Sequence, residues 1–172
     1  MTRYLLTAFL AACLFACVLQ AQPPAASVSA ETKQAFASIK GNLLKTADKV
    51  SEADYSFKPT PEIRSFGEMV AHVADSALMM CSRVKGEQRK GDAATKKSKA
   101  DLTAALKASL DYCDSAYDSL TDANALEPIQ AGRGMRTRVS ALVSNTVHLN
   151  ESYGYLAVYL RLKGITPPSS DR

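Results

Sequence analysis

The chain of 172 residues has no tryptophan, only two histidines, eight glycines and seven prolines. So little glycine and proline argues against a disordered chain, except at its ends. The net charge of +4 is too small to indicate a nucleic-acid-binding protein by itself. Hydrophobic residues make up 47% and charged residues 22%, which is ordinary for a globular protein, and the length fits one domain.

One long apolar run occurs, and it lies at the N-terminus. Arg3 precedes an apolar stretch over residues 4–19, and small and polar residues with two prolines follow it at 20–24. The run is shorter than the roughly 20 apolar residues of a membrane-spanning helix. The pattern predicts a signal peptide over residues 1–21, cut after Ala21, and therefore an exported protein that is periplasmic or secreted, with no transmembrane helix in the mature chain.

A lipid anchor is the alternative for the same segment. Leu10-Ala11-Ala12-Cys13 and Leu14-Phe15-Ala16-Cys17 both resemble the box at which bacterial lipoproteins are cut and lipidated on cysteine. In that case lipid chains on Cys13 or Cys17 would tether the domain to a membrane.

Basic residues are concentrated between residues 83 and 99. Removal of residues 1–21 takes away Arg3 and no acid, so the net charge falls from +4 to +3. No aromatic residue lies within the basic segment to stack on bases, so we interpret it as a solvated loop and expect no nucleic-acid partner. Its members are Arg83, Lys85, Arg89, Lys90, Lys96, Lys97 and Lys99.

Four segments repeat apolar residues at spacings of three and four, the pattern of one helical face. They begin at about Glu31, Ser65, Ser98 and Thr137. Ser65 with Glu68 forms a capping box, and Gly164 followed by Pro167 and Pro168 ends the last helix. Residues 22–30 read as a flexible lead, and residues 121–136 as an irregular connection. No segment alternates apolar and polar residues over enough positions to predict a strand. We therefore expect an all-α four-helix bundle over residues 31–168.

The two histidines, His72 and His148, fall on the second and fourth predicted helices. At 100° per residue, each lies roughly 120° from the centre of its apolar stripe, on the flank of the helix. Small and polar neighbours share these flanks, which suits a groove between helices. Neutral imidazole is a common ligand of zinc, nickel and iron, so the pair is a candidate metal site.

Two longer segments carry a family resemblance. Residues 54–68, from Asp54-Tyr55-Ser56-Phe57-Lys58-Pro59 to Ser65-Phe66-Gly67-Glu68, are followed by His72 and Asp75. Near the C-terminus, His148-Leu149-Asn150-Glu151-Ser152-Tyr153-Gly154 continues to Gly164, Pro167 and Pro168. Together they resemble the DinB-like superfamily over nearly the whole mature chain. The resemblance implies a four-helix bundle and, in many members, a divalent metal held by three histidines.

Carried over by position, the resemblance makes His72 the first metal ligand and His148 the second, and it places Ser152 at the third. A serine hydroxyl is a much poorer ligand than imidazole. Open coordination positions would be left to water, to Glu68 or Glu151, or to a substrate. Glu68 alternatively serves only as a helix cap, and Asp75 either orients the His72 ring or is simply exposed.

The resemblance implies two kinds of function. Relatives include metal-dependent transferases that use low-molecular-weight thiols, and hydrolases. The alternative is a non-catalytic small-ligand-binding or structural module that has lost the third ligand. A small-molecule ligand and a homodimer both remain open as partners.

Cys81 and Cys113 each lie on the apolar stripe of a predicted helix. They are either buried thiols or, because export permits oxidation, a disulfide between the second and third helices.

Overall fold

The computed structural model describes residues 27–171. The predicted signal peptide (1–21), residues 22–26 of the expected lead, and Cys13 and Cys17 lie outside the described residues.

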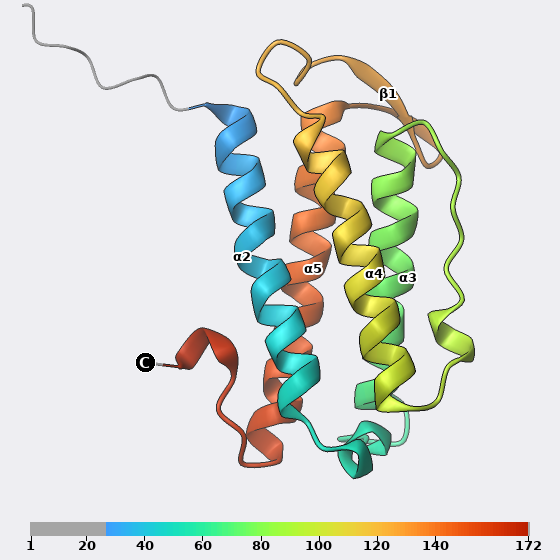
Figure 1. Cartoon of the computed structure of the whole chain (residues 1–172), viewed down its shortest axis with the longest axis vertical. Helices are drawn as coiled ribbons and strands as arrows, with labels where there is room; N and C mark the ends of the chain where they lie inside the picture. The colour runs from blue at the N-terminus through green and yellow to red at the C-terminus, as the bar shows by residue number, and fades with distance from the viewer. Residues whose placement is uncertain (1–26, 172) are drawn as a thin grey trace, which may run out of the picture.

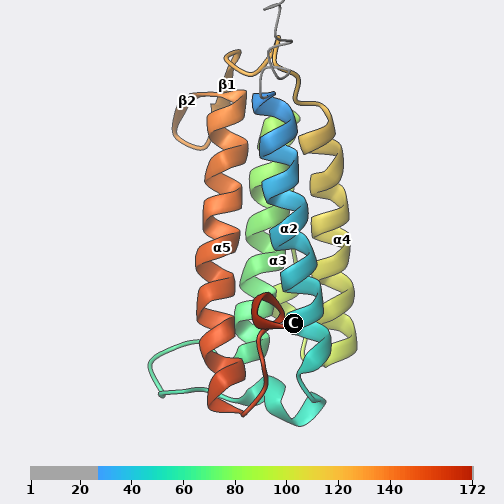
Figure 2. The same cartoon turned by 90° about the vertical axis from the view of Figure 1, so that its left-hand side faces the viewer.

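Four long helices pack side by side along one axis, which confirms the predicted four-helix bundle (Figures 1 and 2). Three short 3-10 helices lie between or after them. The long helices are α2 (Val28–Lys49), α3 (Phe66–Val84), α4 (Lys99–Asp118) and α5 (Arg138–Leu162), and the short ones are η1 (Glu52–Ser56), η2 (Ala93–Thr95) and η3 (Pro168–Ser170). Within residues 27–171, no helix is both long and apolar enough to cross a membrane.

Each long helix begins at a serine or threonine whose side chain accepts a backbone N–H of the first turn. Ser65 and Glu68 form the predicted capping box at α3, and Ser98 caps α4 as expected. Ser27 caps α2, so this helix begins at Val28 and includes the last residues of the segment expected to be flexible. Beyond α5, Gly164 has a φ of +71°, as a glycine at a helix C-terminus should.

The segment from Lys85 to Ser98, here called the crossover, returns along the length of the bundle (Figure 1). It leaves α3 at one end and reaches α4 at the other, with η2 on the way. α3 and α4 therefore run parallel, whereas α2 and α5 run in the opposite direction. A long crossover of this kind is one of the standard ways to connect a bundle.

A two-stranded hairpin corrects the expectation of an all-α chain without strands. Within 121–136, expected to be irregular, β1 (Pro128–Ala131) pairs antiparallel with β2 (Gly134–Thr137). Gly132 has a φ of +75° at the first position of the two-residue turn, where a type II′ turn favours glycine. Each strand has only four residues: β1 alternates exposed and half-buried residues, and β2 is exposed except at Thr137, so neither is long enough to be recognised from the sequence.

The core runs along the bundle axis and includes one polar network. Phe36 of α2 stacks on Tyr117 of α4, with ring centroids 4.0 Å apart. The Tyr117 hydroxyl donates to the Leu142 carbonyl at 2.8 Å and accepts from Asn145 Nδ2 at 3.1 Å, so its burial leaves no unpaired hydroxyl. The largest fully buried side chains include Phe66, Leu43, Leu106, Leu110, Leu120, Leu142, Leu149, Leu156 and Leu160.

Candidate functional site

The structure brings His72 of α3 and His148 of α5 together. Their ring centroids are 5.1 Å apart, and the ring planes are nearly perpendicular, at 84°. The capping box fixes where α3 begins, and the Thr137 cap fixes where α5 begins, so the position of each histidine along its helix follows from local sequence. Packing of α3 against α5 then turns the two flanks toward each other.

The two rings differ in their surroundings. Nε2 of His148 is buried and has no hydrogen-bond partner among the described residues. Nδ1 of His72 lies 3.5 Å from Ser76 Oγ, at the long limit of a hydrogen bond. Burial lowers the pKa of His72, and the charges of Arg64 and His148 lower it further, against the opposing effect of Asp75 and Glu151. These effects favour the neutral form of His72, the form in which imidazole binds a metal.

A groove of about 710 Å³ opens beside His72. It lies between the start of α3, η1 and the crossover, and Tyr55, Arg64, Glu68 and Asp75 are among its lining residues. His148 and Ser152 do not line it, so a ligand in this groove would reach the pair from the His72 side.

Ser152 is the residue that the resemblance places at the third ligand position. Its side chain points into the bundle, because the residue is only 2% exposed. It follows His148 by four residues and therefore shares its helical face. The Ser152 hydroxyl therefore lies inside the bundle, on the α5 face that carries His148.

The geometry fits two of the three protein ligands of such a site. Two imidazoles bound to one ion through metal–nitrogen bonds of about 2.1 Å have ring centroids roughly 5 Å apart, in line with the pair seen here. The buried, unpaired Nε2 of His148 is the kind of atom that a bound ion would satisfy. Within residues 27–171, however, no three His, Cys, Asp or Glu side chains are grouped so as to hold a metal ion. The residues fit an incomplete site with open positions.

Two of the acidic residues expected near the site have other partners. Glu68 Oε2 accepts the Ser65 N–H at 2.6 Å and lies 3.2 Å from Lys58 Nζ. The Ser65 N–H and Lys58 together lower the pKa of Glu68. Glu151 is exposed, and its Oε1 accepts from the Tyr155 hydroxyl at 3.1 Å. The capping role foreseen as the alternative for Glu68 is thus the one observed.

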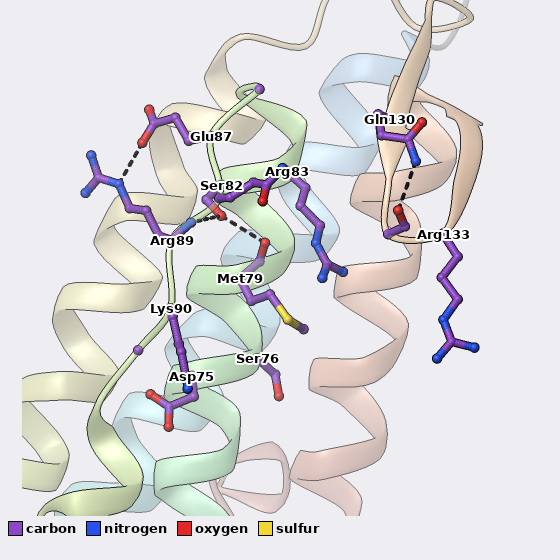
Figure 3. Close-up of a pocket in the computed structure, with 14 residues that line it drawn as sticks. Asp75, Ser76, Met79, Ser82, Arg83, Glu87, Arg89, Lys90, Gln130 and Arg133 are labelled. Atoms are coloured by element: carbon purple, nitrogen blue, oxygen red, sulfur yellow. Dashed lines mark hydrogen bonds and ion pairs between the residues drawn. The ribbon is translucent and has the colours of Figure 1, made fainter.

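Asp75 holds the crossover. Its carboxylate accepts the N–H groups of Ala93 and Ala94 at 2.9 and 3.1 Å, at the start of η2, and makes no hydrogen bond to His72. Figure 3 shows Asp75 pointing toward the crossover and Ser76 away from it. Gly91 passes so close that a Cβ there would lie 2.0 Å from Asp75 Oδ1. Sequence reasoning missed this role because no local pattern predicts where the crossover runs.

Asp75→Ala is expected to lower the free energy of unfolding by about 1–3 kcal/mol, because it leaves two N–H groups without their charged acceptor. Metal affinity should stay within about twofold of the wild type, because the carboxylate does not orient His72. Chemical denaturation and a zinc titration measure the two effects. A large loss of metal affinity without a loss of stability would instead assign Asp75 to the histidine site.

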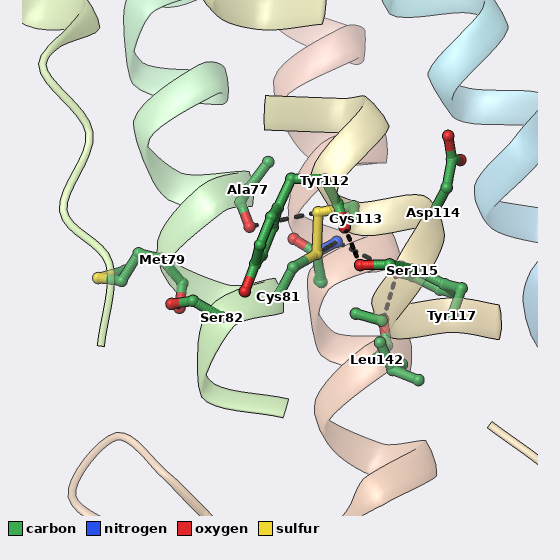
Figure 4. Close-up of a disulfide and its surroundings, with 12 residues drawn as sticks. Ala77, Met79, Cys81, Ser82, Tyr112, Cys113, Asp114, Ser115, Tyr117 and Leu142 are labelled. Atoms are coloured by element: carbon green, nitrogen blue, oxygen red, sulfur yellow. Dashed lines mark hydrogen bonds between the residues drawn. A yellow bond between two sulfur atoms is a disulfide. The ribbon is translucent and has the colours of Figure 1, made fainter. Parts of the chain in front are cut away.

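A disulfide joins Cys81 of α3 to Cys113 of α4 (Figure 4). Both residues are completely buried, and their Cα atoms are 5.3 Å apart, an ordinary distance for a disulfide. The link connects the two parallel helices that the crossover joins. The sequence left open whether these cysteines are buried thiols or a disulfide, and the structure has the disulfide.

The sequence of this chain and its fold are both similar to those of known proteins. The sequence profile of the DinB superfamily matches residues 35–156. No curated protein sequence is detectably similar to the chain.

Among solved structures, a DinB-like protein from Bacillus cereus ATCC 10987 matches with a TM-score of 0.69 and 16% identity, over 80% of this chain and 93% of that one. A DinB-like protein from Bacillus subtilis has a TM-score of 0.65 and 25% identity, over 79% and 93%. A mycothiol-dependent maleylpyruvate isomerase has a TM-score of 0.60 and 14% identity, over 75% of this chain and 59% of that one.

Proposed function

Because the chain belongs to the DinB superfamily, we propose that it is an exported protein with a site for a divalent transition metal, such as zinc, nickel or iron, at His72 and His148. Ser152 occupies the position of the third ligand and leaves coordination positions open. The observation that carries this proposal is the 5.1 Å approach of two histidine rings from different helices, one of them with a buried and unpaired Nε2.

The chain's own residues would do three things at this site. His148 would present its buried Nε2 to the ion, and His72, kept neutral by burial, would present its ring from the facing helix. The Ser76 hydroxyl beside Nδ1 of His72 would favour one orientation of that ring. When bound, the ion would supply Lewis acidity, which lowers the pKa of a water or thiol that occupies an open position.

The reaction class that suits such a site is a metal-dependent transfer or hydrolysis on a small molecule. The fold it shares with a mycothiol-dependent isomerase supports small-molecule chemistry that uses a thiol. An exported protein meets few cytosolic thiols, which favours water over a thiol as the second reactant.

Export is supported by two independent features. The N-terminal segment has the pattern of a signal peptide. The disulfide between Cys81 and Cys113 suits an oxidising compartment. The alternative form of this proposal is a lipid anchor at Cys13 or Cys17, which would tether the domain to a membrane. Mass spectrometry of the exported protein distinguishes a chain that begins with a lipid-bearing cysteine from one that begins at Gln22.

A non-catalytic binding or structural module is the second candidate. The observation that favours it is Ser152, together with the lack of a third His, Cys, Asp or Glu beside the pair in the described part of the chain. In this case the bundle and its histidines would bind a small ligand without turnover, or would bind none.

A zinc titration of the exported chain tests the proposal. The wild type is expected to bind one equivalent, and His72→Ala and His148→Ala should each weaken binding by more than about a hundredfold. Glu62→Gln, a change in an exposed acid on the rim of the groove beside His72, is the matched control and should bind as the wild type does. A wild type that binds no zinc while its circular dichroism shows a folded bundle would reject the metal site and leave the non-catalytic module.

A further inference from the structure

A second and larger groove of about 950 Å³ lies on the other side of Asp75. It is bounded by the second half of α3, the first part of the crossover and the turn of the hairpin (Figure 3). Three basic residues of the segment interpreted as a solvated loop line it, and a fourth comes from the hairpin turn. These are Arg83, Arg89, Lys90 and Arg133.

The groove has an excess of positive charge. Four basic side chains line the groove, and so do two acidic ones, Asp75 and Glu87. The lining therefore has a net charge of +2. Both acids are already engaged: Asp75 accepts two crossover N–H groups, and Glu87 Oε2 lies 2.6 Å from Arg89 Nε. Arg83 and Arg133 have no ion-pair partner within residues 27–171. Their guanidinium groups are therefore available to an anion.

The two free guanidinium groups come from different parts of the fold. Arg83 is half-buried on α3, and Arg133 follows Gly132 in the hairpin turn. A Cβ at Gly132 would lie 3.4 Å from Arg83 Nη1, so the turn packs directly against the Arg83 side chain. Figure 3 shows the Arg83 side chain extending beside Met79 and the Arg133 side chain extending from the hairpin turn at another edge of the groove. The contact with the turn orders the Arg83 side chain before a ligand arrives, which lowers the entropy cost of binding.

We propose that this groove binds a small organic anion, with a carboxylate or phosphate group held between Arg83 and Arg133 and an apolar part against Met79. Guanidinium groups form strong charge-assisted hydrogen bonds with both head groups. The volume is in the range of small-molecule sites. Ser76 lines the groove and contacts His72, so the bound anion would lie next to the histidine pair, although its binding does not require a metal.

Phenyl phosphate and benzoate are suitable probes, and benzamide is the neutral control of the same shape. Titration at low salt, followed by backbone amide shifts, should show saturable binding of one or both anions, centred on Met79, Arg83 and Gly132. Arg83→Gln and Arg133→Gln should each weaken it by about tenfold. Arg136→Gln is the control, because it removes the same charge from the same hairpin but outside this groove. Its affinity for the anion should match that of the wild type.

Saturable binding of either anion at these residues supports the proposal, and the tighter one identifies the head group. Equal binding of benzamide, unchanged affinity in both arginine variants, shifts centred elsewhere, or no saturable binding would each overturn it. The anion titrations contain no metal and the zinc titrations contain no anion, so a failure of the metal site and a failure of the anion groove are distinguishable.

Discussion

Ser152→His is expected to bind zinc at least about a hundredfold more tightly than the wild type, because it would complete a three-histidine site. Ser152 lies one helical turn after His148, on the same face, and its side chain already points into the bundle. The new imidazole would thus replace a hydroxyl that is a weak ligand. Competition with a zinc-binding dye measures the change.

The substitution has a measurable cost in the absence of metal. An imidazole in a space shaped for serine overpacks the bundle, so the metal-free variant should unfold at lower denaturant, by about 1–3 kcal/mol. Zinc should more than restore the loss through its preferential binding to the folded state.

Ser140→His is the matched control, because it adds an imidazole to the same helix about 18 Å from position 152, toward the helix N-terminus. It should leave zinc affinity unchanged. Equal zinc affinity in Ser152→His and the wild type would contradict the placement of Ser152 at the third ligand position.

Removal of the disulfide by Cys81→Ala with Cys113→Ala is expected to lower the free energy of unfolding by about 3–4 kcal/mol. The link closes a loop with a sequence separation of 32, which contains the whole crossover. Without it, the unfolded chain gains the freedom of that loop. The buried sulfur atoms of both residues are also lost from the contact between α3 and α4.

Denaturation of the oxidised wild type, the reduced wild type and the double variant measures this effect. Alkylation under denaturing conditions should find no free thiol at either position in the exported protein. Reductant should destabilise the wild type and leave the double variant unchanged. Quantitative labelling of both thiols in freshly exported protein would contradict the disulfide.

The sequence predicted the helices well because their ends depend on local chemistry. Ser65, Ser98 and Gly164 act within one turn of the chain, so their roles can be inferred without the fold. The hairpin is different, since its strands are held by pairing between short segments with no distinctive pattern. The parallel course of α3 and α4 depends on contacts such as that of Asp75 with Ala93, which no local pattern predicts.

The histidine pair could be predicted in part. Helical periodicity placed His72 and His148 on the flanks of their helices, and the resemblance indicated that the flanks face each other. The unpaired Nε2 of His148 is a property of the packed bundle and has no signal in the sequence. The same holds for the anion groove, because Arg83 and Arg133 line one groove only when the hairpin turn packs on α3.

A long-range 15N–1H spectrum of the two histidine rings during addition of zinc tests whether His72 and His148 bind the same ion. With only two histidines in the chain, each nitrogen can be assigned by comparison with His72→Ala. One ring nitrogen of His72 and Nε2 of His148 are expected to move together to metal-bound chemical shifts and to stop changing at one equivalent. A response from one ring alone, or from neither, would contradict a shared metal site.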